Sequence, residues 1–199
     1  MDDAVLSAKK RDKKVMITDI AIDKIPKLKY KGLSDSENEV LYTLAKLVLL
    51  TSQNNNSDEI AATCTLDTEN PLEVVGISYG NEHEVDVCAD TTSYHFLMSS
   101  KRCAIVVVHN HPSTQTLSLE DIGFFLHFAS VRIMVVVTNQ GTIHYIAKDE
   151  EYDYRNANDL LKECQEDLPD LPEKPSIKEY YMASLMFLSR CSEVGLFYH

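Results

Sequence analysis

The spacing of apolar and polar positions changes along the chain, and each change predicts a new element of secondary structure. After a polar, acidic stretch, apolar side chains recur every three or four residues and predict an amphipathic helix over about residues 36–52. Ser36 and Glu39 occupy the two positions of a capping box at its start. A polar run over residues 53–58 then ends this helix.

Short runs with strand character follow the helix. Residues 60–66 and 72–78 flank a turn-rich cluster and therefore predict a hairpin. Strands and helices that interleave around one apolar core indicate an α/β or α+β fold with three layers. The other predicted elements are a helix over 91–100 capped by Thr91 or Thr92, a strand over 103–109, a helix over 119–129, and a strand pair over 131–137 and 142–147.

The two ends of the chain differ in composition from its middle. Residues 1–33 read as a basic N-terminal tail, residues 34–149 as the main domain, and residues 150–199 as a helical extension. Within the extension, the prolines of residues 167–175 predict a stiff linker. The last helix should begin after Ser176 and end near Gly195. It either packs on its own domain or forms a homo-oligomer interface.

Composition narrows the class of protein. A chain of 199 residues that is 44% hydrophobic can bury a sizeable core. Its five cysteines are odd in number and form no Cys-x-x-Cys pair, so we expect reduced thiols and no disulfide framework. No apolar run approaches the length of a membrane span, and the first residues lack an apolar signal segment. We therefore expect a cytoplasmic protein.

Charge is distributed unevenly. The formal net charge is −12, yet residues 1–31 carry nine basic and five acidic side chains, which leaves a net charge of −16 on the remainder. Such a body should repel nucleic acid phosphates. Only the basic run at residues 9–14 could attract them weakly, and a solvated tail is the simpler interpretation of that run.

Residues 103–121 carry the strongest chemical signal. An apolar run ends in His109-x-His111-Pro112, and nine residues separate His111 from Asp121. Side chains alternate between the faces of a strand, so His109 and His111 should point the same way. Zinc in catalytic sites takes three protein ligands and leaves one position for water. Two imidazoles and Asp121 would supply those three ligands.

Ser118 and Asp121 also have a purely structural interpretation. Ser118-x-x-Asp121 has the spacing of a helix capping box, with Leu117 and Ile122 as its hydrophobic staple. A carboxylate in the first turn is favoured by the helix dipole. The capping role and the ligand role are compatible, because a rigid helix start is a suitable mount for a ligand.

Together these residues resemble the signature of the JAMM (MPN) metallopeptidases, Glu…His-x-His-Pro…Ser-x-x-Asp. The His-Asn-His-Pro-Ser sequence resembles more narrowly the RadC-like branch of that family. Residues 66–70 and Gly80 are similar to the hairpin tip and to the segment that follows the hairpin in that branch. One departure is a loop of six residues between His111 and Ser118, where the family usually has seven.

The resemblance implies a fold and a set of roles. The fold would be a three-layer, cytidine-deaminase-like arrangement of a mixed sheet flanked by helices. His109, His111 and Asp121 would hold one Zn²⁺ per chain, and Ser118 would polarise the scissile carbonyl. The alignment puts Glu59 at the position of the catalytic glutamate, with Glu73 as the alternative.

The function implied is hydrolysis of a peptide or isopeptide amide, often at the tail of a ubiquitin-like tag. Metal-activated water would be the nucleophile and Glu59 the general base. Two other classes stay open: a JAMM-fold binding or assembly module with little or no activity, and a RadC-like protein of DNA repair. Of the remaining histidines, only His144 is a reserve candidate for substrate contact.

Overall fold

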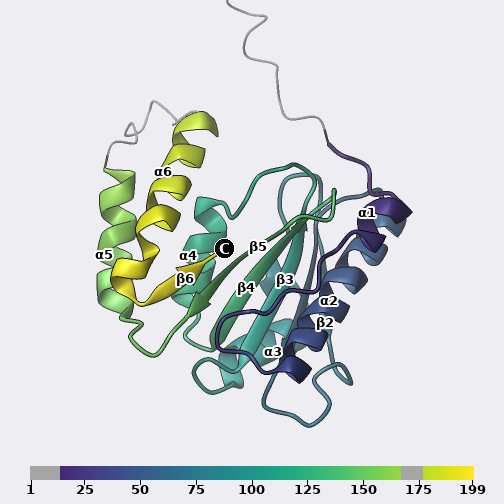
Figure 1. Cartoon of the computed structure of the whole chain (residues 1–199), viewed down its shortest axis with the longest axis horizontal. Coiled ribbons are helices and arrows are strands. Elements are labelled where there is room, and N and C mark those ends of the chain that lie inside the picture. Colours follow the sequence, from purple (N-terminus) through teal and green to yellow (C-terminus); the bar gives the residue numbers. More distant parts are fainter. Residues whose placement is uncertain (1–13, 167–176) are drawn as a thin grey trace, which may run out of the picture.

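A computed structural model describes residues 14–166 and 177–199 of the chain. Its centre is a six-stranded mixed sheet in the order β2-β1-β3-β4-β5-β6 (Figure 1). The β3–β4 pair is parallel and the other neighbouring pairs are antiparallel. The strands are β1 (Ile60–Thr65), β2 (Gly76–Tyr79), β3 (Ile105–His111), β4 (Val131–Thr138), β5 (Ile143–Lys148) and β6 (Leu196–Tyr198).

Helices cover both faces of the sheet (Figure 1). Helices α1 (Asp19–Asp23) and α2 (Asp35–Asn54) pack on one face. The other face carries α3 (Thr91–Ser99), α4 (Leu119–His127), α5 (Tyr154–Gln165) and α6 (Ile177–Arg190), and short 3-10 turns lie at Val87–Ala89 and Cys191–Val194. The expected mixed α/β class is confirmed.

The covering of both faces explains the unbroken apolar run that precedes the histidines. In β3, Ile105 and Val107 enter the core under α4, whereas Val106 and Val108 enter the core under α2. All seven residues of β3 are buried. A strand buried on both sides reads as a continuous hydrophobic run without alternation.

The parallel β3–β4 pair requires a crossover, and α4 forms it. The chain leaves β3 at His111, passes through residues 112–118 and enters α4 on the face that holds Ile105 and Val107. The first turn of α4 can therefore reach side chains that project from the end of β3.

The predicted hairpin forms, although its second strand is shorter than expected. Ala61 pairs with Ser78, and β2 begins only at Gly76. The predicted strand at 103–109 is shifted for a local reason: Cys103 has φ of 57°, which lies in the left-handed region. The extended backbone of β3 therefore begins at Ile105.

Two predicted caps were wrong. Helix α2 is capped by Ser34, whose capping-box partner is Glu37, and not by Ser36 with Glu39. Helix α3 is capped by Asp90, whose side chain accepts a hydrogen bond from the Ser93 amide, and not by Thr91 or Thr92.

The two end segments join the same sheet and cores. In the region read as a basic tail, Ile17, Ile22 and Tyr30 are buried in the α2-side core. In the C-terminal region, Phe187 of α6 is fully buried in the opposite core, and β6 pairs with β5. The final helix therefore packs on its own domain. The basic run at 9–13, the linker at 167–175 and Ser176 lie outside the described residues.

No helix within residues 14–166 and 177–199 combines the length and the apolar character that a bilayer span requires.

Candidate metal centre

The two histidines of the motif lie side by side at the end of β3. His109 and His111 follow Ile105 and Val107 in the alternation, so both side chains point toward α4. Their Nε2 atoms are 3.1 Å apart, and their ring centroids are separated by 4.8 Å. Both residues are buried. The sequence prediction that they share one face is confirmed.

Asp121 reaches the pair from the first turn of α4. Its Oδ1 lies 3.0 Å from His109 Nε2, and its Oδ2 lies 3.3 Å from His111 Nε2. The predicted capping box is also present: Ser118 Oγ accepts a hydrogen bond from the Asp121 amide at 3.0 Å, and Asp121 Oδ2 accepts one from the Ser118 amide at 2.7 Å. Capping and convergence on the histidines therefore coexist.

The donor set fits a zinc ion. Each of His109, His111 and Asp121 offers one ligand atom, and these atoms all lie within 4.8 Å of one another. Tetrahedral zinc with bonds of about 2.0–2.1 Å places neighbouring ligands about 3.3 Å apart. The observed Nε2–Nε2 distance of 3.1 Å is close to that value.

The Nδ1 atoms of the two histidines differ in their hydrogen-bond partners. His111 Nδ1 lies 3.3 Å from the Gln115 carbonyl oxygen, which suits an Nδ1–H donor and an Nε2 free to ligate. His109 Nδ1 is buried and has no hydrogen-bond partner among the described residues. The loop thus fixes the tautomer of one imidazole but not of the other.

The electrostatics of the cluster follow from burial and close opposite charges. Burial alone would raise the pKa of Asp121, but the adjacent His109 and His111 hold it well below its usual range. Burial opposes protonation of His111, yet its contact with Asp121 raises its pKa to about 9. Without a metal, His111 and Asp121 therefore form a largely buried ion pair.

Glu59 belongs to the same neighbourhood. Ala61 pairs with His109, and continuing this antiparallel register by two residues places Glu59 opposite His111. Glu59 also shares its strand face with Ala61, which packs under α4. It is 8% exposed, and burial raises its pKa although the nearby histidines act in the opposite direction.

The alternative base does not lie in this neighbourhood. Glu73 is exposed in the connection between β1 and β2, at the end of β1 that is remote from Glu59. Because β1 and β3 are antiparallel, that end lies beside Ile105 and not beside the histidines. The structure thus brings together Glu59 and the three ligand candidates, and leaves Glu73 apart.

Ser118 is committed to other contacts. Its hydroxyl donates to Asp121 Oδ2 at 2.7 Å while its oxygen accepts from the Asp121 amide. It lies at the site, but it would have to exchange its bond to Asp121 to act on a substrate carbonyl.

A buried network of amide side chains, which the sequence did not indicate, holds the backbone next to Glu59. Asn110 lies between the histidines and points to the opposite face, where its Oδ1 accepts from the Ile60 amide at 2.8 Å. Its Nδ2 donates to Asn139 Oδ1 at 2.8 Å and to Ser52 Oγ at 3.1 Å. The available signal was an asparagine between two histidines at the end of an apolar run.

An acidic cleft of about 760 Å³ opens beside the ligand candidates, with His109 and Asp121 in its wall. It carries three further carboxylates, and no lysine or arginine of the described residues lines it. Such a surface favours ligands with positive charge. The other lining residues are Tyr79, Gly80, Asn81, Glu84, Val85, Asp86, Val87, Glu120, Phe124 and Met134.

The shortened loop of residues 112–117 is held from two sides. Leu117 is fully buried under α4, and Thr116 Oγ1 lies 2.8 Å from the Tyr198 hydroxyl. That hydroxyl lies 3.5 Å from His144 Nδ1. His144, the reserve candidate for substrate contact, therefore supports the loop through Tyr198.

Comparisons of the chain with protein-family models, with curated proteins and with solved structures gave no match.

Proposed function

We propose that the protein is a zinc-dependent peptidase or isopeptidase of the JAMM type, with one Zn²⁺ held by His109, His111 and Asp121. The observation that carries the proposal is the convergence of two strand-end imidazoles and one helix-start carboxylate within 3.0–3.3 Å. The motif's resemblance to the RadC-like branch supports the same assignment, including a three-layer, JAMM-like fold.

Zinc bound there would supply Lewis acidity toward water and toward an amide carbonyl. Glu59 is the proton carrier: it accepts a proton from the attacking water and delivers it to the leaving amine. The direction of its pKa shift suits this role, because burial favours the protonated carboxyl that the second transfer requires. The Asn110 network holds the backbone that carries Glu59.

The acidic cleft supports a preference for substrates with positively charged side chains. An extended peptide that carries lysine or arginine near the scissile bond would meet Glu84, Asp86 and Glu120. An amide at the flexible tail of a ubiquitin-like protein has the accessibility that such a cleft requires.

A non-catalytic binding module is the second candidate. The engagement of the Ser118 hydroxyl by Asp121 favours it, because that hydroxyl is then unavailable to a carbonyl oxygen. The RadC-like DNA interpretation gains no support at this cleft, since a carboxylate lining repels phosphates.

The test combines metal analysis with hydrolysis of lysine-linked isopeptide and basic peptide substrates. We expect about one zinc per chain, little zinc after His109→Ala plus His111→Ala, and full zinc but no hydrolysis in Glu59→Gln. Glu73→Gln is the matched control and should keep full activity. Equal zinc in wild type and the double variant would contradict the metal site, whereas zinc without hydrolysis in wild type would support the binding module.

A further inference from the structure

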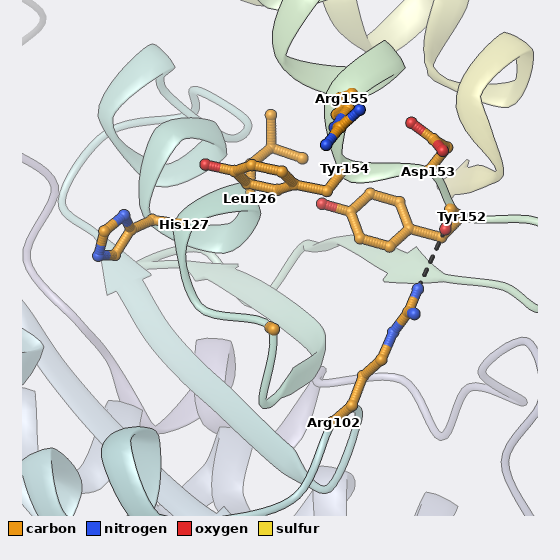
Figure 2. Close-up of a pocket in the computed structure, with 8 residues that line it drawn as sticks. Arg102, Leu126, His127, Tyr152, Asp153, Tyr154 and Arg155 are labelled. Atoms are coloured by element: carbon orange, nitrogen blue, oxygen red, sulfur yellow. Dashed lines mark hydrogen bonds between the residues drawn. The ribbon is translucent and has the colours of Figure 1, made fainter.

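A second hollow lies at the other end of α4, away from the histidine pair. It measures about 550 Å³, within the usual range for small-molecule sites. Leu126 and His127 from the end of α4, Arg102 from the segment before β3, and residues 152–155 at the start of α5 surround it (Figure 2).

The side chains that line this basic pocket carry a net positive charge, although the net charge of the protein is −12. Arg102 donates to the Tyr152 carbonyl oxygen at 3.0 Å, which holds its guanidinium at the rim (Figure 2). Arg155 is exposed and has no ion pair among the described residues. Of the described residues, one carboxylate lines the pocket: Asp153 accepts a hydrogen bond from the Asn156 amide at 2.8 Å as the cap of α5, and its charge offsets one of the two arginines.

Backbone donors add to this charge. Helix α5 has twelve residues, and the amides of Tyr154 and Arg155 in its first turn have no acceptor in the part of the chain that the structure describes. Free amides at a helix start, together with the positive end of the helix dipole, favour a bound anion.

Tyr152 provides an independent indication of a ligand. It is 7% exposed, and its buried hydroxyl has no hydrogen-bond partner among the described residues. Figure 2 shows this hydroxyl directed toward Tyr154 and Leu126, among the side chains that line the pocket. An unpaired buried hydroxyl costs about 1–3 kcal/mol, and an acceptor on a ligand would remove that cost.

A buried cation lies beneath the same tyrosine. Lys148 Nζ is 5.1 Å from the centre of the Tyr152 ring and donates to the carbonyl oxygens of Phe125 and Phe128, each at 2.8 Å. No carboxylate of the described residues pairs with it. Its charge therefore adds to the positive potential of the pocket.

We propose that this basic pocket binds a nucleoside monophosphate, with the phosphate at Arg102, Arg155 and the start of α5. The flat base lies against Tyr154, which is 51% exposed, and against Leu126. The Tyr152 hydroxyl donates to an oxygen of the ligand. The site is separate from the metal centre and does not depend on the proposed peptidase activity.

The test is calorimetric titration of the full chain with AMP, adenosine and inorganic phosphate at low ionic strength. We expect AMP to bind more tightly than either fragment. Arg155→Gln should weaken AMP about tenfold, as expected for one charge-assisted contact, and leave adenosine unchanged. Tyr154→Ala should weaken AMP and leave phosphate unchanged.

The matched control is Lys24→Gln, which removes the same charge from an exposed residue next to α1. Among the described residues, Arg155 has no hydrogen bond or ion pair that its loss could disturb. Unfolding curves verify that each variant folds. Equal affinity for AMP and adenosine would overturn the anion site, as would equal losses in Arg155→Gln and Lys24→Gln. Equal affinity for phosphate and AMP would overturn the part of the proposal that concerns the base.

Discussion

The two ends of helix α4 carry opposite chemistry. At its start, Asp121 meets two histidines beside an acidic cleft. At its end, Lys148 donates to the Phe125 and Phe128 carbonyls beneath a pocket rimmed by arginines. A helix dipole stabilises anions at the N-terminus and cations at the C-terminus. The dipole of α4 therefore favours Asp121 at its start and Lys148 at its end. These two side chains in turn favour a cation at one end of the helix and an anion at the other.

The largest expected effect concerns metal at the start of α4. Zinc at a thousandfold excess over its dissociation constant should stabilise the stripped protein by about 4 kcal/mol, because only the folded chain assembles the three ligands. Thermal unfolding with zinc and after chelation measures this difference. His109→Ala plus His111→Ala should show no zinc effect, and Arg155→Gln should show the full effect. An undiminished zinc effect in the double variant would contradict zinc binding by His109 and His111 at the start of α4.

The next effect concerns the buried cation at the end of α4. Burial lowers the pKa of Lys148 to about 8, below its unfolded value, so the unfolded chain binds more protons between these two values. The free energy of unfolding should therefore rise with pH from about 8 to 10.5, on the order of 2–3 kcal/mol relative to Lys148→Met. Urea unfolding at several pH values measures it. Parallel curves for the two proteins would contradict a buried, charged Lys148.

A smaller effect is expected from the cap of α4. Ser118→Ala removes the acceptor for the Asp121 amide and should cost about 1 kcal/mol in the free energy of unfolding. Denaturant unfolding of this variant beside Ser192→Ala, an exposed serine without a capping role, measures the difference. Equal stability of the two variants would mean that the cap contributes nothing.

The smallest effect concerns the charge of the cleft. Glu120→Gln should lower kcat/KM for a lysine-containing peptide about two- to fivefold, since one exposed charge contributes under about 1 kcal/mol. Glu150→Gln removes an exposed charge outside the cleft and should leave the rate unchanged. A loss that persists at high salt would argue for a role other than charge.

The two ends of α4 also differ in how far sequence could predict them. His109, His111, Ser118 and Asp121 lie within 13 residues, so strand alternation and the capping spacing were enough to bring them together. The basic pocket combines Arg102, the end of α4, Lys148 and the start of α5, which only the tertiary fold brings together. No local spacing indicates such a site.

The wrongly predicted cap of α2 shows what the capping-box pattern alone cannot decide. Ser34-x-x-Glu37 and Ser36-x-x-Glu39 satisfy the same capping pattern. Contacts from distant residues distinguish them: Arg132 Nη1 donates to Glu37 at 3.2 Å, and Asn38 accepts the Tyr30 amide at 3.0 Å. Such contacts set the helix start, and the sequence pattern does not contain them.

The segment from Val194 to β6 contacts residues beside both candidate sites. At one end, the Val194 carbonyl oxygen accepts the Asp153 amide at 3.4 Å, next to the basic pocket. At the other, the Tyr198 hydroxyl holds Thr116 in the loop whose Gln115 carbonyl lies beside His111. This continuous path of contacts allows a coupling free energy between the two sites. Any change in zinc affinity that a pocket ligand produces must be matched by an equal change in ligand affinity when zinc binds.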